Sequence, residues 1–130
     1  MPNLTKMTGD DIAAAMETLT VAWQNDQFRM ALLYGETSIT PEGRARMTAA
    51  MAARPVDFQV AALGAVALDT TFTEDNDPDK DRTFGTVTVR GERLFWKINL
   101  YDEAYEWASP APADKTVTRR VLTIMVPSEY

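Results

Sequence analysis

Cysteine and histidine are both absent from this chain of 130 residues. Without cysteine there are no disulfides, thiolate metal ligands or thiol nucleophiles, and a small domain without disulfides favours a reducing compartment. Without histidine the chain lacks the usual general base near neutral pH and the commonest nitrogen ligand of zinc. These absences weigh against ordinary catalysis, and we expect neither a cofactor nor a metal site.

Long apolar runs and excess positive charge are also absent. The longest apolar run, Val60–Leu68, falls far short of the ~20 residues that a membrane-spanning helix requires. Residues 1–11 lack the apolar centre of a secretory signal. The formal net charge is −6, so the chain as a whole repels phosphate backbones. We therefore expect a cytoplasmic protein without direct contact to nucleic acid or membrane.

Length and composition favour one globular domain. Hydrophobic residues make up 45% and charged residues 25% of the chain, near the average for folded proteins. A chain of this size can bury roughly two-thirds of the surface that it exposes when unfolded. We predict a flexible leader at residues 1–7 and a single domain over residues 8–130.

The first half of the chain carries helical patterns. A helix over residues 10–28 is predicted from a capping residue at Thr8 or Asp10 and from four apolar residues at helical spacing, Ile12, Met16, Leu19 and Trp23.

Three shorter elements are predicted between this helix and residue 69. Threonine and isoleucine favour a strand over residues 37–40. Thr40-Pro41 is typical of a helix start and predicts a helix over residues 41–53. Pro55 disfavours helical geometry in the residue before it, so a separate helix is predicted over residues 55–68.

The clearest pattern in the second half is a β-hairpin. Residues 84–89 and 92–101 alternate in polarity around Arg90-Gly91, and a two-residue turn there sets Val87 opposite Leu94. Further strands are predicted over residues 104–108 and 120–126. Helices followed by strands predict an α+β fold, with two to three helices packed on an antiparallel sheet of four to five strands.

The second hairpin strand has two different faces. Leu94, Trp96, Ile98 and Leu100 are predicted to face the core, whereas Phe95, Lys97, Asn99 and Tyr101 lie on the opposite face. Phe95 and Tyr101 could stack on nucleic-acid bases. The nearby Arg82, Arg90 and Arg93 are too few for such a platform, so a second helix or a partner protein that covers this face is favoured.

Residues 69–81 hold six acids and one lysine. Asp75, Asp77 and Asp79 alternate as at the start of a calcium loop, but Lys80 and Thr86 stand where an EF-hand needs glycine and glutamate. A solvated turn is therefore favoured over a cation site. With the aromatic residues and a second acidic turn, these acids form the predicted partner-binding set: Glu74, Asp75, Asp77, Asp79, Asp81, Phe95, Tyr101, Asp102 and Glu103.

The sequence also offers two catalytic alternatives. Asp102, Glu103 and Glu106 could supply an acid and a base if a cleft separated their pKa values, and Lys97 could act as a nucleophile if it were buried. Surface turn charges and a lysine lying across an exposed face are the favoured interpretations.

Four strings in the chain resemble a bacterial family whose function is unknown. Members look like DNDPYGEHDFG, FWKIDYYD, SPDPADP and TRVLTIMLAxEY. The matching stretches are residues 74–85, 95–102, 109–114 and 118–130, and the resemblance covers about residues 57–130. The chain departs from the family at Asp81-Arg82-Thr83, Asn99 and Ala111, so a catalytic or metal site at those positions in relatives is not expected here.

The resemblance implies a small cytoplasmic protein of a plasmid or another mobile element. Three hypotheses follow. The first is a non-catalytic binding or inhibitor protein, of the anti-restriction or anti-CRISPR kind, whose carboxylates stand in for phosphates on a basic nucleic-acid-binding surface. The second is a structural or oligomer-forming accessory domain, for which a homodimer is the expected form. The third is an enzyme that depends on carboxylates or a cation.

Overall fold

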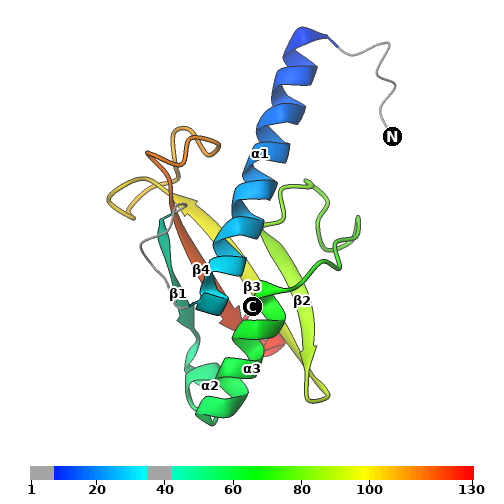
Figure 1. The fold of residues 1–130 in the computed structure, drawn as a ribbon, viewed down its shortest axis with the longest axis vertical. Helices are drawn as coiled ribbons and strands as arrows, with labels where there is room; N and C mark the ends of the chain where they lie inside the picture. The colour runs from blue at the N-terminus through cyan, green and yellow to red at the C-terminus, as the bar shows by residue number, and fades with distance from the viewer. Residues whose placement is uncertain (1–7, 35–41) are drawn as a thin grey trace.

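The computed structural model describes residues 8–34 and 42–130. The predicted leader at 1–7 and the predicted strand at 37–40 lie outside the described residues. The described elements confirm an α+β fold (Figure 1), and they are α1 (Gly9–Ala31), η2 (Leu32–Tyr34), β1 (Gly43–Met47), α2 (Ala49–Ala52), α3 (Val56–Ala67), β2 (Phe84–Val89), β3 (Glu92–Tyr101), β4 (Arg119–Met125) and η3 (Pro127–Glu129).

One mixed sheet, in the order β1-β4-β3-β2, organises the domain. β2, β3 and β4 are antiparallel neighbours, and β1 runs parallel to β4. Figure 1 shows α1 and α3 lying across one face of this sheet, which we call the helix side. The opposite face, which carries Phe95 and Lys97, is called the open face. Within the described residues, no helix is both long and apolar enough to cross a membrane.

The hairpin matches its prediction. Val87 pairs with Leu94 and Gly85 pairs with Trp96. Arg90 and Gly91 have φ angles of 51° and 82°, as a tight hairpin turn requires. Alternate residues of β3 enter the core on the helix side, where Leu94 and Trp96 are fully buried.

The predicted helix over residues 41–53 is wrong. Residues 43–47 form β1, and the helical part is α2 alone. Parallel pairing with β4 overrides the helical preference of the alanines and methionines, which makes the sheet mixed rather than antiparallel. Gly43 permits this pairing, because a Cβ there would lie 2.1 Å from the backbone oxygen of Arg120.

The predicted strand over residues 104–108 is also wrong. A single bridge joins Ala108 to Tyr101, and the residues between them turn. The Asp102 carboxylate accepts a hydrogen bond from the backbone N–H of Glu106 at 3.0 Å, and Tyr105 has a φ of 58°. This local turn competes with the extended conformation. The helices over residues 10–28 and 55–68 and the last strand agree with prediction to within a few residues at each end.

Candidate functional site

Helix α1 is tied to the sheet by buried polar side chains in its second half. Arg29 is 2% exposed, and its Nη1 donates to the backbone oxygens of Val66 at 2.7 Å and Asp69 at 2.9 Å. Its guanidinium carbon lies 4.7 Å from the centre of the Trp96 ring. Burial lowers the pKa of Arg29, and the neighbouring Asp26 carboxylate opposes that shift. Arg29 therefore joins α1, the end of α3 and the core of the sheet.

Asp69 fixes the start of the loop that follows α3. One of its carboxylate oxygens accepts from the Trp96 indole N–H at 2.9 Å, and the other accepts from the backbone N–H of Thr71 at 2.9 Å. Because Trp96 belongs to the buried face of β3, the loop begins at a defined point beside α1.

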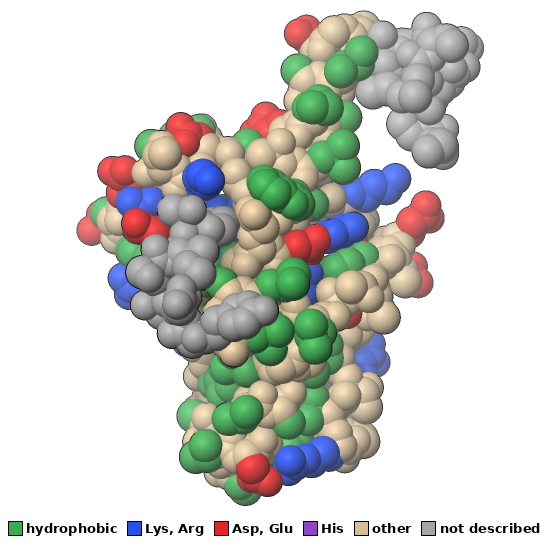
Figure 2. Space-filling view, viewed as in Figure 1, with side chains coloured by type: hydrophobic (Ala, Val, Ile, Leu, Met, Phe, Trp, Pro, Cys, Tyr) green, Lys and Arg blue, Asp and Glu red, His purple; other side chains and the backbone are tan. Residues whose placement is uncertain are grey.

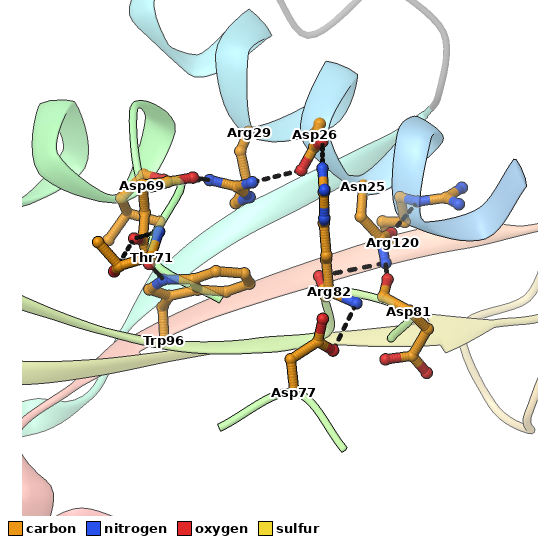
Figure 3. A network of polar contacts seen from close by, with 11 residues as sticks. Asn25, Asp26, Arg29, Asp69, Thr71, Asp77, Asp81, Arg82, Trp96 and Arg120 are labelled. Carbon is orange, nitrogen blue, oxygen red and sulfur yellow. Dashed lines mark hydrogen bonds and ion pairs between the residues drawn. The ribbon is translucent and has the colours of Figure 1, made fainter. Parts of the chain in front are cut away.

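A second buried arginine, Arg120 of β4, meets α1 from the sheet. Its Nε donates to the Asn25 side-chain oxygen at 2.7 Å, and its Nη2 donates to that of Gln24 at 2.9 Å. Asn25 in turn donates to the backbone oxygen of Asp81 at 2.9 Å (Figure 3). Burial lowers the pKa of Arg120 to about 10. No carboxylate in the described part of the chain pairs with Arg120.

These contacts hold α1 and the loop apart around a cavity of about 600 Å³. Asp26 pairs with both Arg29 and Arg82, and Figure 3 shows the two arginines converging on this carboxylate. The Asp26–Arg82 pair separates the cavity from a neighbouring hollow of about 290 Å³. The larger cavity is lined by Leu19, Ala22, Trp23, Asp26, Phe72, Thr73, Glu74, Asp77, Lys80 and Arg82.

An exposed apolar row runs along α1 into this cavity. Its four members are the residues that predicted the helix, and they are 51–63% exposed: Ile12, Met16, Leu19 and Trp23. The first half of α1 extends beyond the sheet (Figure 1), and Figure 2 shows hydrophobic side chains gathered along α1 and over α3. The buried side of α1 is a different one, and it includes Val21, Asn25 and Phe28. The helical spacing therefore located the helix, while the sheet contacts another of its faces.

The predicted acidic residues divide into two groups. Glu74, Asp75 and Asp79 are exposed on the loop. Asp77 is buried, and its carboxylate accepts a hydrogen bond from the backbone N–H of Arg82 at 2.9 Å. Burial raises the pKa of Asp77. Asp81 is half-buried and accepts from the Thr83 hydroxyl at 2.9 Å. The last two carboxylates thus hold the loop in shape, whereas the first three face solvent.

The other predicted partner residues lie away from the cavity. Phe95 packs on the open face, with its ring centre 5.3 Å from that of Phe84. Tyr101 stands at the far end of β3, opposite Arg119. Asp102 serves the turn described above, and Glu103 is exposed. The structure does not gather the nine predicted residues into one site.

Sequence reasoning missed the polar anchors of α1. Asn25 and Arg29 are four residues apart, so they share a helix face with the apolar Phe28 beside them. Arg120 lies on the same face of β4 as the apolar Leu122 and Ile124, which follow it at every second position. Polar residues in register with core positions were the available signal, but their partners are far away in the sequence. In the described ranges, 8–34 and 42–130, no cluster of three carboxylates could hold a metal ion.

The fold and this site define a small α+β domain with a partly apolar cavity framed by ion pairs. The chain belongs to the family described as "Protein of unknown function (DUF3768)", whose model matches residues 47–129. This match confirms the resemblance seen in the sequence. No curated protein and no solved structure matches the chain. The matched residues include α3, the loop over residues 69–81 (the acidic loop) and β2–β4, whereas α1 precedes them.

Proposed function

We propose that this protein is a non-catalytic, cytoplasmic protein-binding protein whose partner docks on the helix side. The observation that carries the proposal is the exposed apolar row of α1. Burying one such side chain is worth roughly 1.5–3 kcal/mol, so a helix face that leaves four of them in water is suited to a partner.

The row also indicates what the partner looks like. Apolar residues at the spacing of Ile12, Met16, Leu19 and Trp23 present one ridge, which packs best against another helix or an apolar groove. The row ends at the cavity, whose opposite wall includes Phe72 and Glu74. A partner segment with apolar residues followed by basic residues fits both walls.

Exposed carboxylates give the partner surface its expected charge. Glu74 lines the cavity, and Asp75 and Asp79 follow on the same loop. Opposite charges across an interface raise the association rate and select the partner. In its narrower form the proposal is an inhibitor of a mobile element, of the anti-restriction or anti-CRISPR kind, with these carboxylates in the place of phosphates.

Affinity capture from host extract tests the proposal with two pairs of substitutions. Leu19→Ser with Trp23→Ser interrupts the apolar row, and Glu74→Gln with Asp75→Asn neutralises two exposed carboxylates of the acidic loop. A matched control, Glu103→Gln with Glu106→Gln, removes the same charge from a distant turn. We expect the wild type and the control to retain a protein at ~50 mM salt, both site variants to lose it, and ~500 mM salt to weaken it. Equal retention by all four proteins would refute the proposal.

Self-association is a second candidate, favoured by one further observation. The row continues through Met30 and Leu33, so apolar residues follow the four-three spacing of a coiled coil, with Asp26 as the single polar member. The flanking positions Ala13, Ala15, Thr20 and Ala22 are small and uncharged, which lets two copies of α1 approach without like-charge contact over residues 12–23.

Light scattering after size exclusion distinguishes the two candidates. A dimer of two acidic chains strengthens as salt rises, because screening weakens repulsion while apolar burial persists. A basic partner shows the opposite dependence. If the protein self-associates, Leu19→Glu is expected to leave a monomer. A wild-type monomer at ~100 μM and ~500 mM salt would remove the second candidate and leave the first intact.

A further inference from the structure

The open face of the sheet gathers cations in a chain whose total charge is negative. Alternate strand residues point to opposite faces, so the neighbours of the buried Leu94, Trp96 and Leu122 point to the open face. No carboxylate occupies an open-face position of the four described strands. Five cations do, and they are Arg44, Arg46, Arg93, Lys97 and Arg119.

Four of these five cations have no ion pair with a carboxylate of the described residues. The exception is Arg119, whose Nε lies 3.1 Å from a Glu42 carboxylate oxygen. Arg46 and Lys97 stand on either side of Thr123 in one row across three strands. Neighbouring strands are ~4.8 Å apart, so the backbones that carry Arg46 and Lys97 are about 10 Å apart. Thr123 between them is 4% exposed, so the two cationic side chains flank a filled surface on which a phosphate can rest.

Aromatic rings lie among these cations. The Phe95 ring centre is 5.8 Å from that of Tyr130, and Tyr130 is 76% exposed. The Arg93 guanidinium lies 5.2 Å from the Phe95 ring, and that of Arg44 lies 3.7 Å from the Tyr105 ring. Single-stranded nucleic acid is bound by aromatic rings that stack on its bases and by positive charges that contact its phosphates, and this face offers both.

We propose that the open face binds single-stranded nucleic acid. Lys97, Arg46 and Arg44 contact phosphates, while Phe95 and Tyr130 stack against bases. A duplex does not expose its bases to a flat sheet, and a polyphosphate has no rings to stack. The acidic loop limits the path of the phosphates on one side. Its Asp79 and Asp81 line a hollow of about 300 Å³ together with Phe84 and Tyr130. The phosphates therefore run over β1, β4 and β3.

This proposal departs from the expectation drawn from the total charge. That expectation counted Arg82, Arg90 and Arg93 near the sheet. In the structure Arg82 pairs with Asp26 and Arg90 with Asp57, so neither serves the open face. Pairing of β1 with β4 brings Arg44 and Arg46 there instead, and sequence reasoning had placed both in a helix.

Fluorescence anisotropy of the full chain with a labelled 12-nucleotide single strand, as DNA and as RNA, tests the proposal. The wild type is expected to bind at ~50 mM salt and to weaken severalfold at ~200 mM. Arg46→Gln with Lys97→Gln should weaken binding at least about tenfold. The charge-matched control, Arg90→Gln with Lys115→Gln, should bind within about twofold of the wild type. Phe95→Leu should weaken binding by about 5- to 150-fold, the contribution of one stacked base.

Three outcomes would overturn the proposal. One is no binding of either strand by a folded wild type at ~100 μM. Another is an equal loss in the open-face variant and in its control, which would show general charge attraction. The third is competition by polyphosphate as effective as that by unlabelled strand, together with an unchanged affinity of Phe95→Leu. Thermal unfolding of each variant confirms that it is folded, and Tyr130→Leu replaces Phe95→Leu if the latter unfolds.

Discussion

The two faces of the sheet differ in both packing and charge. On the helix side, Trp96, Leu122 and Ile124 are fully buried beneath the helices, and a loop with six acids and one lysine follows α3. The open face carries five cations and half-buried aromatic rings on the same strands. Neighbouring residues of one strand therefore belong to two different environments.

This difference shows that the net charge of a small domain does not describe its surfaces. The value of −6 averages an acidic loop with a basic sheet face. Alternation along each strand separates what the sequence interleaves. Substitutions at two adjacent positions of one strand therefore compare the two faces, because the two side chains lie on opposite sides of the sheet.

The largest expected effect is in β4. Leu122 is fully buried on the helix side, and Leu122→Ala should lower the free energy of unfolding by about 2–5 kcal/mol, because it leaves a cavity in a close-packed core. Its neighbour Val121 is half-buried on the open face, and Val121→Ala should cost less than half as much. Urea denaturation followed by tryptophan fluorescence measures both, and equal losses would erase the distinction between the faces.

Next in size is the contrast between two arginines. Arg29→Met leaves the backbone oxygens of Val66 and Asp69 without this donor, and Asp26 keeps only Arg82. We expect a loss of about 3 kcal/mol, as for breaking a buried ion pair. Arg46→Met on the open face should stay within about 0.5 kcal/mol. A fully stable Arg29→Met would show that apolar packing replaces the buried charge, which contradicts its role as an anchor.

Gly85 and Thr86 offer a smaller contrast in β2. A Cβ at Gly85 would lie 2.4 Å from Trp96 Nε1 and 2.6 Å from an Asp69 oxygen, so Gly85→Ala should cost about 1–3 kcal/mol and shift the indole N–H resonance. Thr86→Ala, on the open face, should change stability by at most about 0.5 kcal/mol. An unchanged indole resonance in Gly85→Ala would mean that the hydrogen bond between Trp96 and Asp69 tolerates the new methyl group.

The sequence predicted what local pattern controls. Thr8 and Asp11 form a capping box at the start of α1, and Arg90-Gly91 makes the hairpin turn, so the long helix and the hairpin were found with their register. The prediction for residues 43–47 is wrong because a five-residue strand acquires its conformation from pairing with β4, 77 residues later. Local propensity carries no information about such a partner.

The site was less predictable than the fold, for the same reason. Arg29 lies 37 residues from its acceptor Val66, and Asn25 lies 95 residues from Arg120. The composition of the acidic loop was visible in the sequence. Only the fold shows that Asp77 turns inward while Asp75 and Asp79 remain outside.

Asp77 gives the smallest and most specific test. Burial raises the pKa of its carboxyl group, the backbone N–H of Arg82 opposes this shift, and Asp81 adds to it. The ionised form therefore costs more in the folded chain than in the unfolded chain, so the wild type should lose stability relative to Asp77→Asn as the pH rises through the folded-state pKa. Asp77→Ala should be less stable than Asp77→Asn by the same amount at every pH, because it also removes the acceptor for Arg82. Urea titrations of the three proteins between pH 3 and pH 7 measure this, and a wild type that gains on Asp77→Asn with rising pH would show that the Arg82 hydrogen bond outweighs burial.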